Sequence, residues 1–271
     1  MRSQGRLSRR SFLIGTGCAG FGLGTPLRAQ AQVSAHEFRL LRTQAAGAGT
    51  PPSSGRPALR YNGALPGPTL RAKRGEELRV RLVNELAEPT SVHWHGVRLA
   101  NPMDGVPQLT QSATAPGESF DYRFKLPDAG TFWYHAAVDA QLDQGLYGAL
   151  IVEEEQPVGV DRDIVLVLGM PADGADARAP ALVNGSLRPD IAVTSGERLR
   201  LRLINANASR GLVLRLEGHA AWVMAIDGQP AEPALARGSR LALGPGNRAD
   251  LFVDATADGG TVAPLLAGVA D

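Results

Sequence analysis

The sequence predicts an all-β protein made of two tandem Greek-key β-sandwiches, the second of which is incomplete at its C-terminus. Glycine (32) and proline (19) are abundant among the 271 residues, whereas aromatic residues make up 5%, which favours short strands and turns over long helices. Several segments alternate apolar and polar residues, as half-buried strands do. Residues 196–205 repeat residues 75–84 with seven identities in ten positions, which indicates two copies of one unit.

The first copy contains a series of short predicted strands. Residues 75–84 show the pattern best, because Leu78, Val80 and Leu82 share one face while Arg79 and Arg81 share the other. The run Glu153-Glu154-Glu155-Gln156-Pro157 marks the end of the copy. In chain order, we expect strands at residues 37–41, 75–84, 91–96, 119–124, 130–137 and 148–152.

The second copy follows the first at an offset of 121 residues but ends earlier. Residues 262–266 match the strand at 130–137 and contain no metal-binding side chain. Ten residues follow Thr261, whereas the first copy continues for 24 residues from Thr131 to Glu155. We therefore expect the second sandwich to lack its closing strand, either because the chain is a fragment or because another segment or chain supplies the strand.

The N-terminal sequence has the features of an export signal. Residues 8–13 contain Arg9-Arg10 in a pattern that resembles a twin-arginine motif, and residues 12–27 are apolar and glycine-rich. Residues 29–31 form a small-x-small cleavage site. A transmembrane anchor would need a longer apolar run, so no stable membrane span is expected after cleavage. The predicted domains are a signal peptide at 1–31 and two sandwiches at 32–157 and 158–271, in an exported or periplasmic protein.

Charge and cysteine content exclude several classes of function. The net charge is +1, and removing the five arginines of residues 1–31 leaves −4, which argues against nucleic-acid binding. The single cysteine, Cys18, lies inside the predicted signal. The mature chain then has no disulfide, no thiolate nucleophile and no thiolate metal ligand.

Three histidines form the candidate metal site. His93 and His95 are two residues apart on one predicted strand, so both side chains share a face while Trp94 points to the opposite face. His135 lies on the later strand at 130–137. Neutral imidazole nitrogens on a rigid strand are suitable ligands for copper or zinc.

The ordered motifs resemble those of the multicopper oxidases, a family that includes laccases and copper-resistance oxidases. The matching segments are Pro66-Gly67-Pro68-Thr69-Leu70, His93-Trp94-His95-Gly96, Met103-Asp104-Gly105-Val106-Pro107, Gly130-Thr131-Phe132-Trp133-Tyr134-His135 and Gly145-Leu146-Tyr147-Gly148-Ala149-Leu150-Ile151-Val152.

This resemblance implies cupredoxin-like domains, of which the chain matches the first and the middle one, and copper as the cofactor. It implies that His93 is a type 2 copper ligand and that His95 and His135 are type 3 ligands. It makes Asp104 the candidate catalytic residue, delivering protons to bound oxygen.

The chain also departs from the family pattern. Ala137 occupies the place of a fourth histidine, and a methyl group cannot bind copper. The type 1 site and the other cluster histidines belong to a last domain that the chain does not match. We therefore expect a partial trinuclear site, at most weak copper uptake and no oxidase activity by this chain alone.

Several interpretations stay open. The chain is the N-terminal part of an oxidase that oxidises phenols or metal ions and reduces O2, with a C-terminal cupredoxin domain or a partner chain supplying the rest. Alternatively, it is a copper-free cell-envelope scaffold of the same fold, or a truncated remnant. In the last two cases the three histidines only pack between strands, and Asp104-Gly105 is a simple turn.

Overall fold

The computed structural model describes residues 37–46, 59–138, 140–169, 181–187, 189–256 and the backbone of 265–269. The predicted export signal and Cys18 lie outside these residues. Within them the chain is almost entirely β, with two short 3-10 helices, η1 (Asn101–Met103) and η2 (Arg237–Ser239). No helix in this described part is long and apolar enough to span a membrane.

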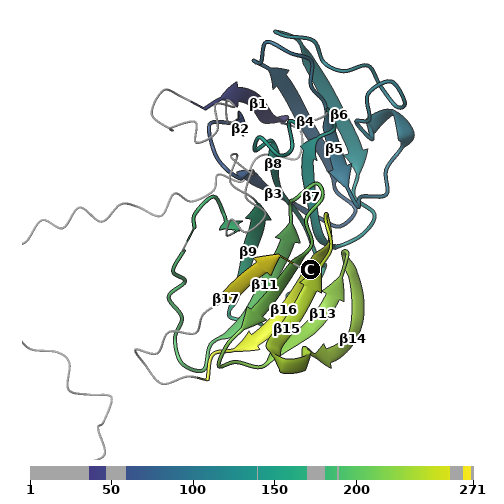
Figure 1. Cartoon of the computed structure of the whole chain (residues 1–271). Coiled ribbons are helices and arrows are strands. Elements are labelled where there is room, and N and C mark those ends of the chain that lie inside the picture. Colours follow the sequence, from purple (N-terminus) through teal and green to yellow (C-terminus); the bar gives the residue numbers. More distant parts are fainter. Residues whose placement is uncertain are drawn as a thin grey trace, which may run out of the picture. The chain divides into compact units, whose positions relative to one another are not determined.

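The first sandwich contains two four-stranded sheets, ordered β2-β1-β4-β6 and β3-β8-β7-β5 (Figure 1). Its strands are β1 (Arg39–Ala45), β2 (Leu59–Tyr61), β3 (Gly67–Lys73), β4 (Glu77–Asn84), β5 (Val92–His95), β6 (Ser119–Lys125), β7 (Gly130–Ala136) and β8 (Tyr147–Glu153).

The alternation predicted for residues 75–84 is confirmed in β4. Leu78, Val80 and Leu82 are buried in the core between the two sheets. On the opposite face, Arg81 forms two hydrogen bonds with Asp121 of β6 at 2.6 and 2.8 Å, with both side chains partly exposed to water. Strand β4 therefore divides an apolar interior from a solvated surface, as period-two patterning requires.

The second sandwich has sheets ordered β10-β9-β11-β16-β13-β14 and β15-β12-β17. Its strands are β9 (Arg162–Gly169), β10 (Leu182–Val183), β11 (Arg198–Asn205), β12 (Leu212–Leu216), β13 (Ala221–Ile226), β14 (Gln229–Leu235), β15 (Arg240–Leu243), β16 (Arg248–Asp254) and β17 (Leu265–Val269). A leucine-rich core, which includes Leu201, Leu203 and Leu214, fills the space between the sheets.

The internal repeat is visible in the strand pairing. In the first sandwich β1 runs parallel to β4, which pairs antiparallel with β6. Strands β9, β11 and β16 reproduce this arrangement in the second sandwich. Strand β12 pairs antiparallel with β17 (Leu265–Val269) as β5 pairs with β7, so β17 takes the place of β7 in the second sandwich. Of the predicted segment 262–266, residues 262–264 lie outside the described part of the chain.

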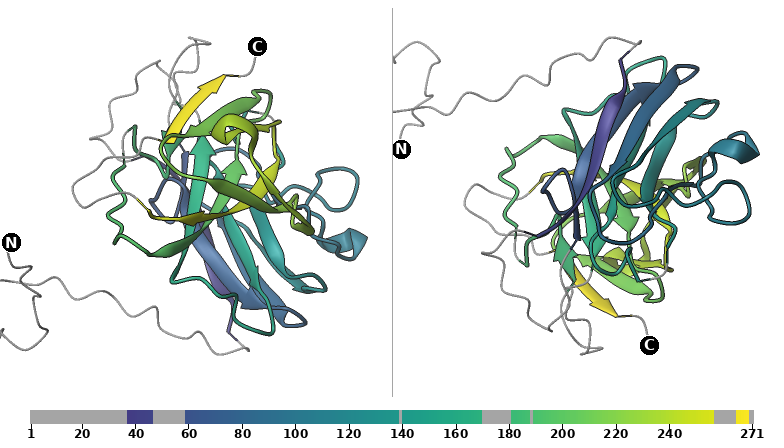
Figure 2. Two further views of the ribbon diagram at one scale, coloured as in Figure 1. Left: turned by 90° about the horizontal axis from the view of Figure 1, so that it is seen from below. Right: turned by 90° about the horizontal axis from the view of Figure 1, so that it is seen from above.

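The described residues contain no counterpart of β8 beside β17. In the first sandwich β8 lies between β7 and β3. The two views in Figure 2 show β17, in yellow, at the margin of the second sandwich. At the offset of 121 residues, β3 corresponds to residues 188–194, where Ile191 and Val193 are exposed and outside any strand.

The two sandwiches share a small apolar cluster where they meet. Trp133, Tyr147 and Ala149 of the first sandwich pack with side chains of β9 and the end of β11. The latter group consists of Val167, Ile204 and Ala206. Because Trp133 alternates with Tyr134 along β7, the face of β7 that carries His135 is turned toward this junction rather than into the first core.

Candidate metal centre

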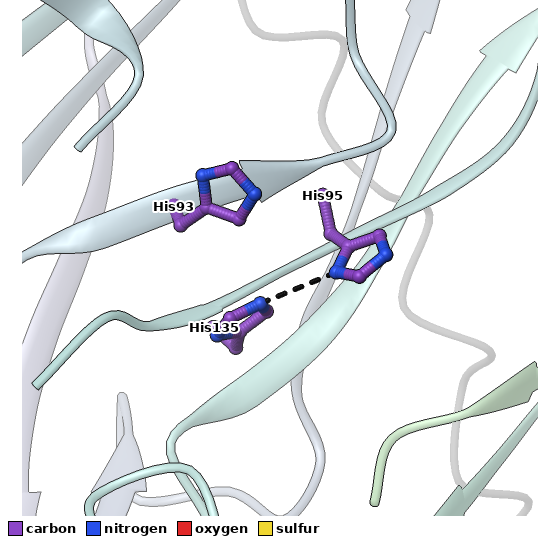
Figure 3. A group of neighbouring side chains, drawn as sticks. All are labelled: His93, His95 and His135. Carbon is purple, nitrogen blue, oxygen red and sulfur yellow. Dashed lines mark hydrogen bonds between the residues drawn. The ribbon is translucent and has the colours of Figure 1, made fainter. Parts of the chain in front are cut away.

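Strands β5 and β7 bring the three predicted histidines together. The strands are antiparallel, and their register places His93 opposite His135 and His95 opposite Trp133. Trp94, between the two β5 histidines, is fully buried in the first core, as the alternation predicts. Figure 3 shows the three imidazoles gathered beside the two strands, with His95 and His135 facing each other.

The ring nitrogens of these histidines converge. One ligand nitrogen from each of His93, His95 and His135 lies within 4.8 Å of the others. His95 Nδ1 and His135 Nε2 are 3.4 Å apart. Two nitrogens that bind one ion at about 2.0–2.1 Å with tetrahedral angles are about 3.3 Å apart, so the spacing of this pair suits a shared metal ion.

Backbone carbonyls determine which ring nitrogens are free. His135 Nδ1 is 2.8 Å from the carbonyl oxygen of Ala136, and His93 Nδ1 is 2.9 Å from that of Asp104. A carbonyl only accepts hydrogen bonds, so each Nδ1 carries the proton and each Nε2 keeps its lone pair. This arrangement orients both rings as metal-ligating histidines are commonly oriented.

The surroundings keep two of the imidazoles neutral. Burial lowers the pKa of His95 to about 3, and the nearby His135 and Arg248 act in the same direction. Burial also lowers the pKa of His135 to about 4, partly opposed by its hydrogen bond to Ala136. Both rings are therefore unprotonated at neutral pH, which is the state that binds a metal ion.

A loop after η1 places Asp104 beside His93. The Asp104 carboxylate oxygen Oδ1 is 3.4 Å from His93 Nδ1, and the side chain is partly exposed. The next residue must be glycine: Gly105 has φ +81°, and a Cβ there would be 1.7 Å from the carbonyl oxygen of Val92. The close approach of this backbone to β5 fixes Asp104 next to the ring.

The second sandwich contributes contacts that the sequence did not reveal. The His95 ring lies against Gly246, where an added Cβ would be 2.7 Å from His95 Cε1. The guanidinium of Arg248 lies beside Gly96, where an added Cβ would be 2.3 Å from Nη2. The Pro245-Gly246 turn matches Pro116-Gly117 in the first copy, yet Gly117 has open space around it. Only the packing of the sandwiches distinguishes the two turns.

The donor set within the described residues fits a copper ion. The three converging imidazoles are suitable copper ligands. Ala137, two residues beyond His135, is partly buried and offers no donor where a fourth ligand is expected. Of the other two histidines in the sequence, His36 lies outside the described residues and His219 is not in this group.

Comparisons with known proteins agree on one family. Two multicopper oxidase domain models match the chain, at residues 45–157 and 127–261. The chain belongs to the multicopper oxidase family. The multicopper oxidase MmcO of Mycobacterium tuberculosis is 36% identical over 77% of the chain, and copper resistance protein A of Escherichia coli is 29% identical over 88%.

Solved structures of this family have the same cupredoxin-like sandwiches. A multicopper oxidase from Pseudomonas thermotolerans matches with a TM-score of 0.76 and 38% identity, covering 85% of this chain and 60% of that structure. The chain spans about half the length of the curated relatives, 49% of MmcO and 51% of the E. coli protein.

Proposed function

We propose that this chain is a copper-holding part of an exported, copper-dependent oxidoreductase. His93, His95 and His135 hold the copper, and the approach of His95 Nδ1 to His135 Nε2 at 3.4 Å is the observation that carries the proposal. The names of the relatives, which include laccases and an iron transport multicopper oxidase, support phenols or metal ions as reducing substrates and O2 as the oxidant.

The residues around the site have separable tasks. Copper, when bound, supplies the one-electron chemistry that imidazole and carboxylate groups lack. His135 and His93 present Nε2 because their Nδ1 protons are held by backbone carbonyls. Asp104, partly exposed and 3.4 Å from His93 Nδ1, is the carboxylate that lies between water and the site, where a proton relay would need one.

We propose that residues 1–271 alone do not reduce oxygen. Three converging imidazoles with Ala137 provide too few ligands for three coppers. The remaining ligands, and a site that accepts electrons from the substrate, would come from a further cupredoxin domain or from a partner chain. The coverage of about half of each relative supports this interpretation.

Export by the twin-arginine route to the periplasm is part of the proposal. It is supported by Arg9-Arg10 and the apolar residues that follow. Replacing Arg9 and Arg10 together by lysine should keep the protein inside the cell, whereas the same replacement of Arg2 and Arg6 should leave export intact. Fractionation of cells that express each variant measures this, and equal export of both variants would refute the assignment.

A copper-free scaffold is the second candidate function. Ala137 favours it, because loss of a ligand is harmless to a protein that binds no metal. Under this alternative the same β framework binds another component of the cell envelope, and the histidines only pack between strands.

Copper loading distinguishes the two functions. The metal-free chain should take up copper, and a His95→Gln/His135→Gln double variant should lose that uptake. His219→Gln is the control, since His219 is outside the histidine group. Copper content after dialysis and an oxygen electrode with a phenol provide the readouts. Equal copper content in all three proteins would reject the proposed site. Oxygen consumption by the unaltered chain would reject the proposal that this chain alone does not reduce oxygen.

A further inference from the structure

Strands β11 and β16 of the second sandwich carry a buried cluster of charged side chains on the face toward the first sandwich. Arg202 and Asp250 are cross-strand partners, and their side chains are 1% and 2% exposed. Asp250 Oδ2 accepts hydrogen bonds from Arg200 at 2.6 and 3.1 Å and from Arg202 Nη1 at 3.4 Å. Isolated buried charges are unfavourable, so this cluster requires its full set of partners.

The two arginines also pair with Glu154 and Asp163, each at 2.7 Å, and a hydroxyl group from the first sandwich joins the cluster. Thr131 Oγ1 donates to Asp250 Oδ1 at 2.6 Å and accepts from Arg202 Nη1 at 2.9 Å. Thr131 is fully buried in β7, four residues before His135, and residues separated by two or four positions share one face of a strand. The hydroxyl group thus connects the second sandwich to the histidine-bearing face of β7.

Arg248 adds a second connection from the same strand. It precedes Asp250 by two residues and donates from Nε to the carbonyl oxygen of Thr131 at 3.3 Å. An ion pair with Asp227 at 3.1 Å holds its guanidinium beside Gly96, the residue after His95. Strand β16 therefore contacts both β7 and the end of β5, the two strands that carry the histidines.

We infer that Thr131, Arg202 and Asp250, together called the interdomain clasp, are positioning residues for the metal centre. The clasp fixes β7 against the second sandwich and so holds His135 Nε2 near His95 Nδ1. Metal affinity depends on ligand placement to a fraction of an ångström, and the residues that orient ligands affect affinity strongly. This inference rests on the proposed copper site.

The variant Thr131→Val tests the clasp with little change in volume. It removes the hydroxyl group and leaves Asp250 with both arginines. Thr43→Val is the matched control, because Thr43 is equally buried and its hydroxyl group bonds to Asn84 at 3.0 Å. Thr43 lies in β1, which belongs to the other sheet of the first sandwich from the strands that carry His93, His95 and His135. Thr131→Ser retains the hydroxyl group and should behave like the unaltered chain.

Two measurements are needed. Competition titration with a chelator gives the copper affinity of the folded variants, and we expect Thr131→Val to weaken it roughly 10-fold or more, with Thr43→Val unchanged. Hydrogen exchange of the metal-free protein reports on the clasp directly, and the amides of β7 should exchange faster in Thr131→Val than in Thr43→Val.

The outcomes separate this inference from the proposed function. If the unaltered chain binds copper and Thr131→Val binds it equally well, the clasp does not position the ligands, although the copper site stands. If the unaltered chain takes up no copper, the proposed function fails. In that case the hydrogen-exchange measurement still tests the clasp. If the β7 amides exchange at the same rate in Thr131→Val as in the unaltered chain, the clasp does not hold β7 in place.

Discussion

His95 and Trp133 are cross-strand partners in β5 and β7, and their rings stack with centroids 4.7 Å apart and planes 28° from parallel. The Trp133 ring also lies 4.4 Å from that of His135. Because Trp133 belongs to the apolar cluster where the sandwiches meet, one side chain supports two candidate ligands and the domain junction together.

Truncating Trp133 should therefore affect both stability and metal uptake. Trp133→Ala removes a buried indole, and we expect a loss of about 3–5 kcal/mol in the free energy of unfolding together with weaker copper binding. Trp133→Phe keeps an aromatic surface against His95, so it should lower the free energy of unfolding by less. Urea unfolding and copper titration measure both effects. Trp222→Ala, at a half-exposed position, is the control and should leave copper binding unchanged.

Gly96 and Gly75 provide a matched pair for the contact with Arg248. Their φ angles are +84° and +83°, but only at Gly96 does an added Cβ approach the guanidinium. Gly75→Ala should lower the free energy of unfolding by about 1–2 kcal/mol through backbone strain alone. Gly96→Ala should cost about 1–3 kcal/mol more, because the side chain overlaps Arg248. Equal losses in thermal or urea unfolding would show that Arg248 moves aside freely.

Asp250 and Asp121 occupy corresponding places in the two sandwiches and face corresponding arginines. Asp250→Asn removes the buried carboxylate that Arg200 and Arg202 share and leaves them with the more exposed Glu154 and Asp163. We therefore expect the free energy of unfolding to fall by up to about 3–5 kcal/mol. Asp121→Asn breaks a solvent-exposed pair and should cost about 0–1 kcal/mol. Urea unfolding at pH 7 compares the two variants, and similar losses would mean that the buried pair is no more important than the surface one.

Acidification should destabilise the metal-free chain through its histidines. Their folded-state pKa values of about 4 (His135) and about 3 (His95) lie below the unfolded value of about 6.5. Between pH 6.5 and 4 the unfolded state binds more protons, so stability is full above this range and is lost as pH falls through it. For His135 this loss is on the order of 2–3 kcal/mol.

Urea unfolding with a chelator at several pH values measures this effect. The variant His135→Gln should show a smaller loss of stability than the unaltered chain between pH 6.5 and 4, because glutamine does not titrate. Carboxylates contribute equally to both proteins, so the difference isolates the histidine. Parallel stability curves would contradict the lowered pKa.

Replacing Ala137 by histidine should strengthen copper binding. Residue 137 follows His135 by two positions, and a histidine there adds a fourth imidazole next to the existing three. We expect tighter binding in a chelator competition. The same substitution in a His93→Gln/His95→Gln background should give a smaller gain. If Ala137→His alone brings no increase, the three histidines do not surround a metal ion in solution.

Much of the fold follows from local sequence patterns. The alternation in β4 predicts which side chains enter the first core, and the two-residue spacing of His93 and His95 predicts that both leave it on the same side. The repeat predicts a second sandwich of the same kind as the first. These predictions succeed because the face of a strand that a side chain occupies depends only on whether its position is odd or even.

The arginines of β11 show that side-chain alternation alone does not predict burial. Arg200 and Arg202 match Arg79 and Arg81 of the first copy, and nothing in the repeat distinguishes them. In the structure Arg81 is exposed, whereas Arg200 and Arg202 are buried against the first sandwich. Burial depends on the neighbouring domain, which the sequence of the strand does not specify.

The sequence by itself determined the all-β class, the two copies and the three histidines that share one side of β5 and β7. Tertiary structure alone decided that His95 Nδ1 and His135 Nε2 approach to 3.4 Å, that Gly246 and Arg248 border them, and that Thr131 meets Asp250. The physical reason is the sequence separation of the contacts. Side-chain alternation acts between neighbouring residues, whereas these contacts join strands 40 to more than 110 residues apart. The histidine contact requires β5 to pair with β7, and the other contacts require the two sandwiches to pack together.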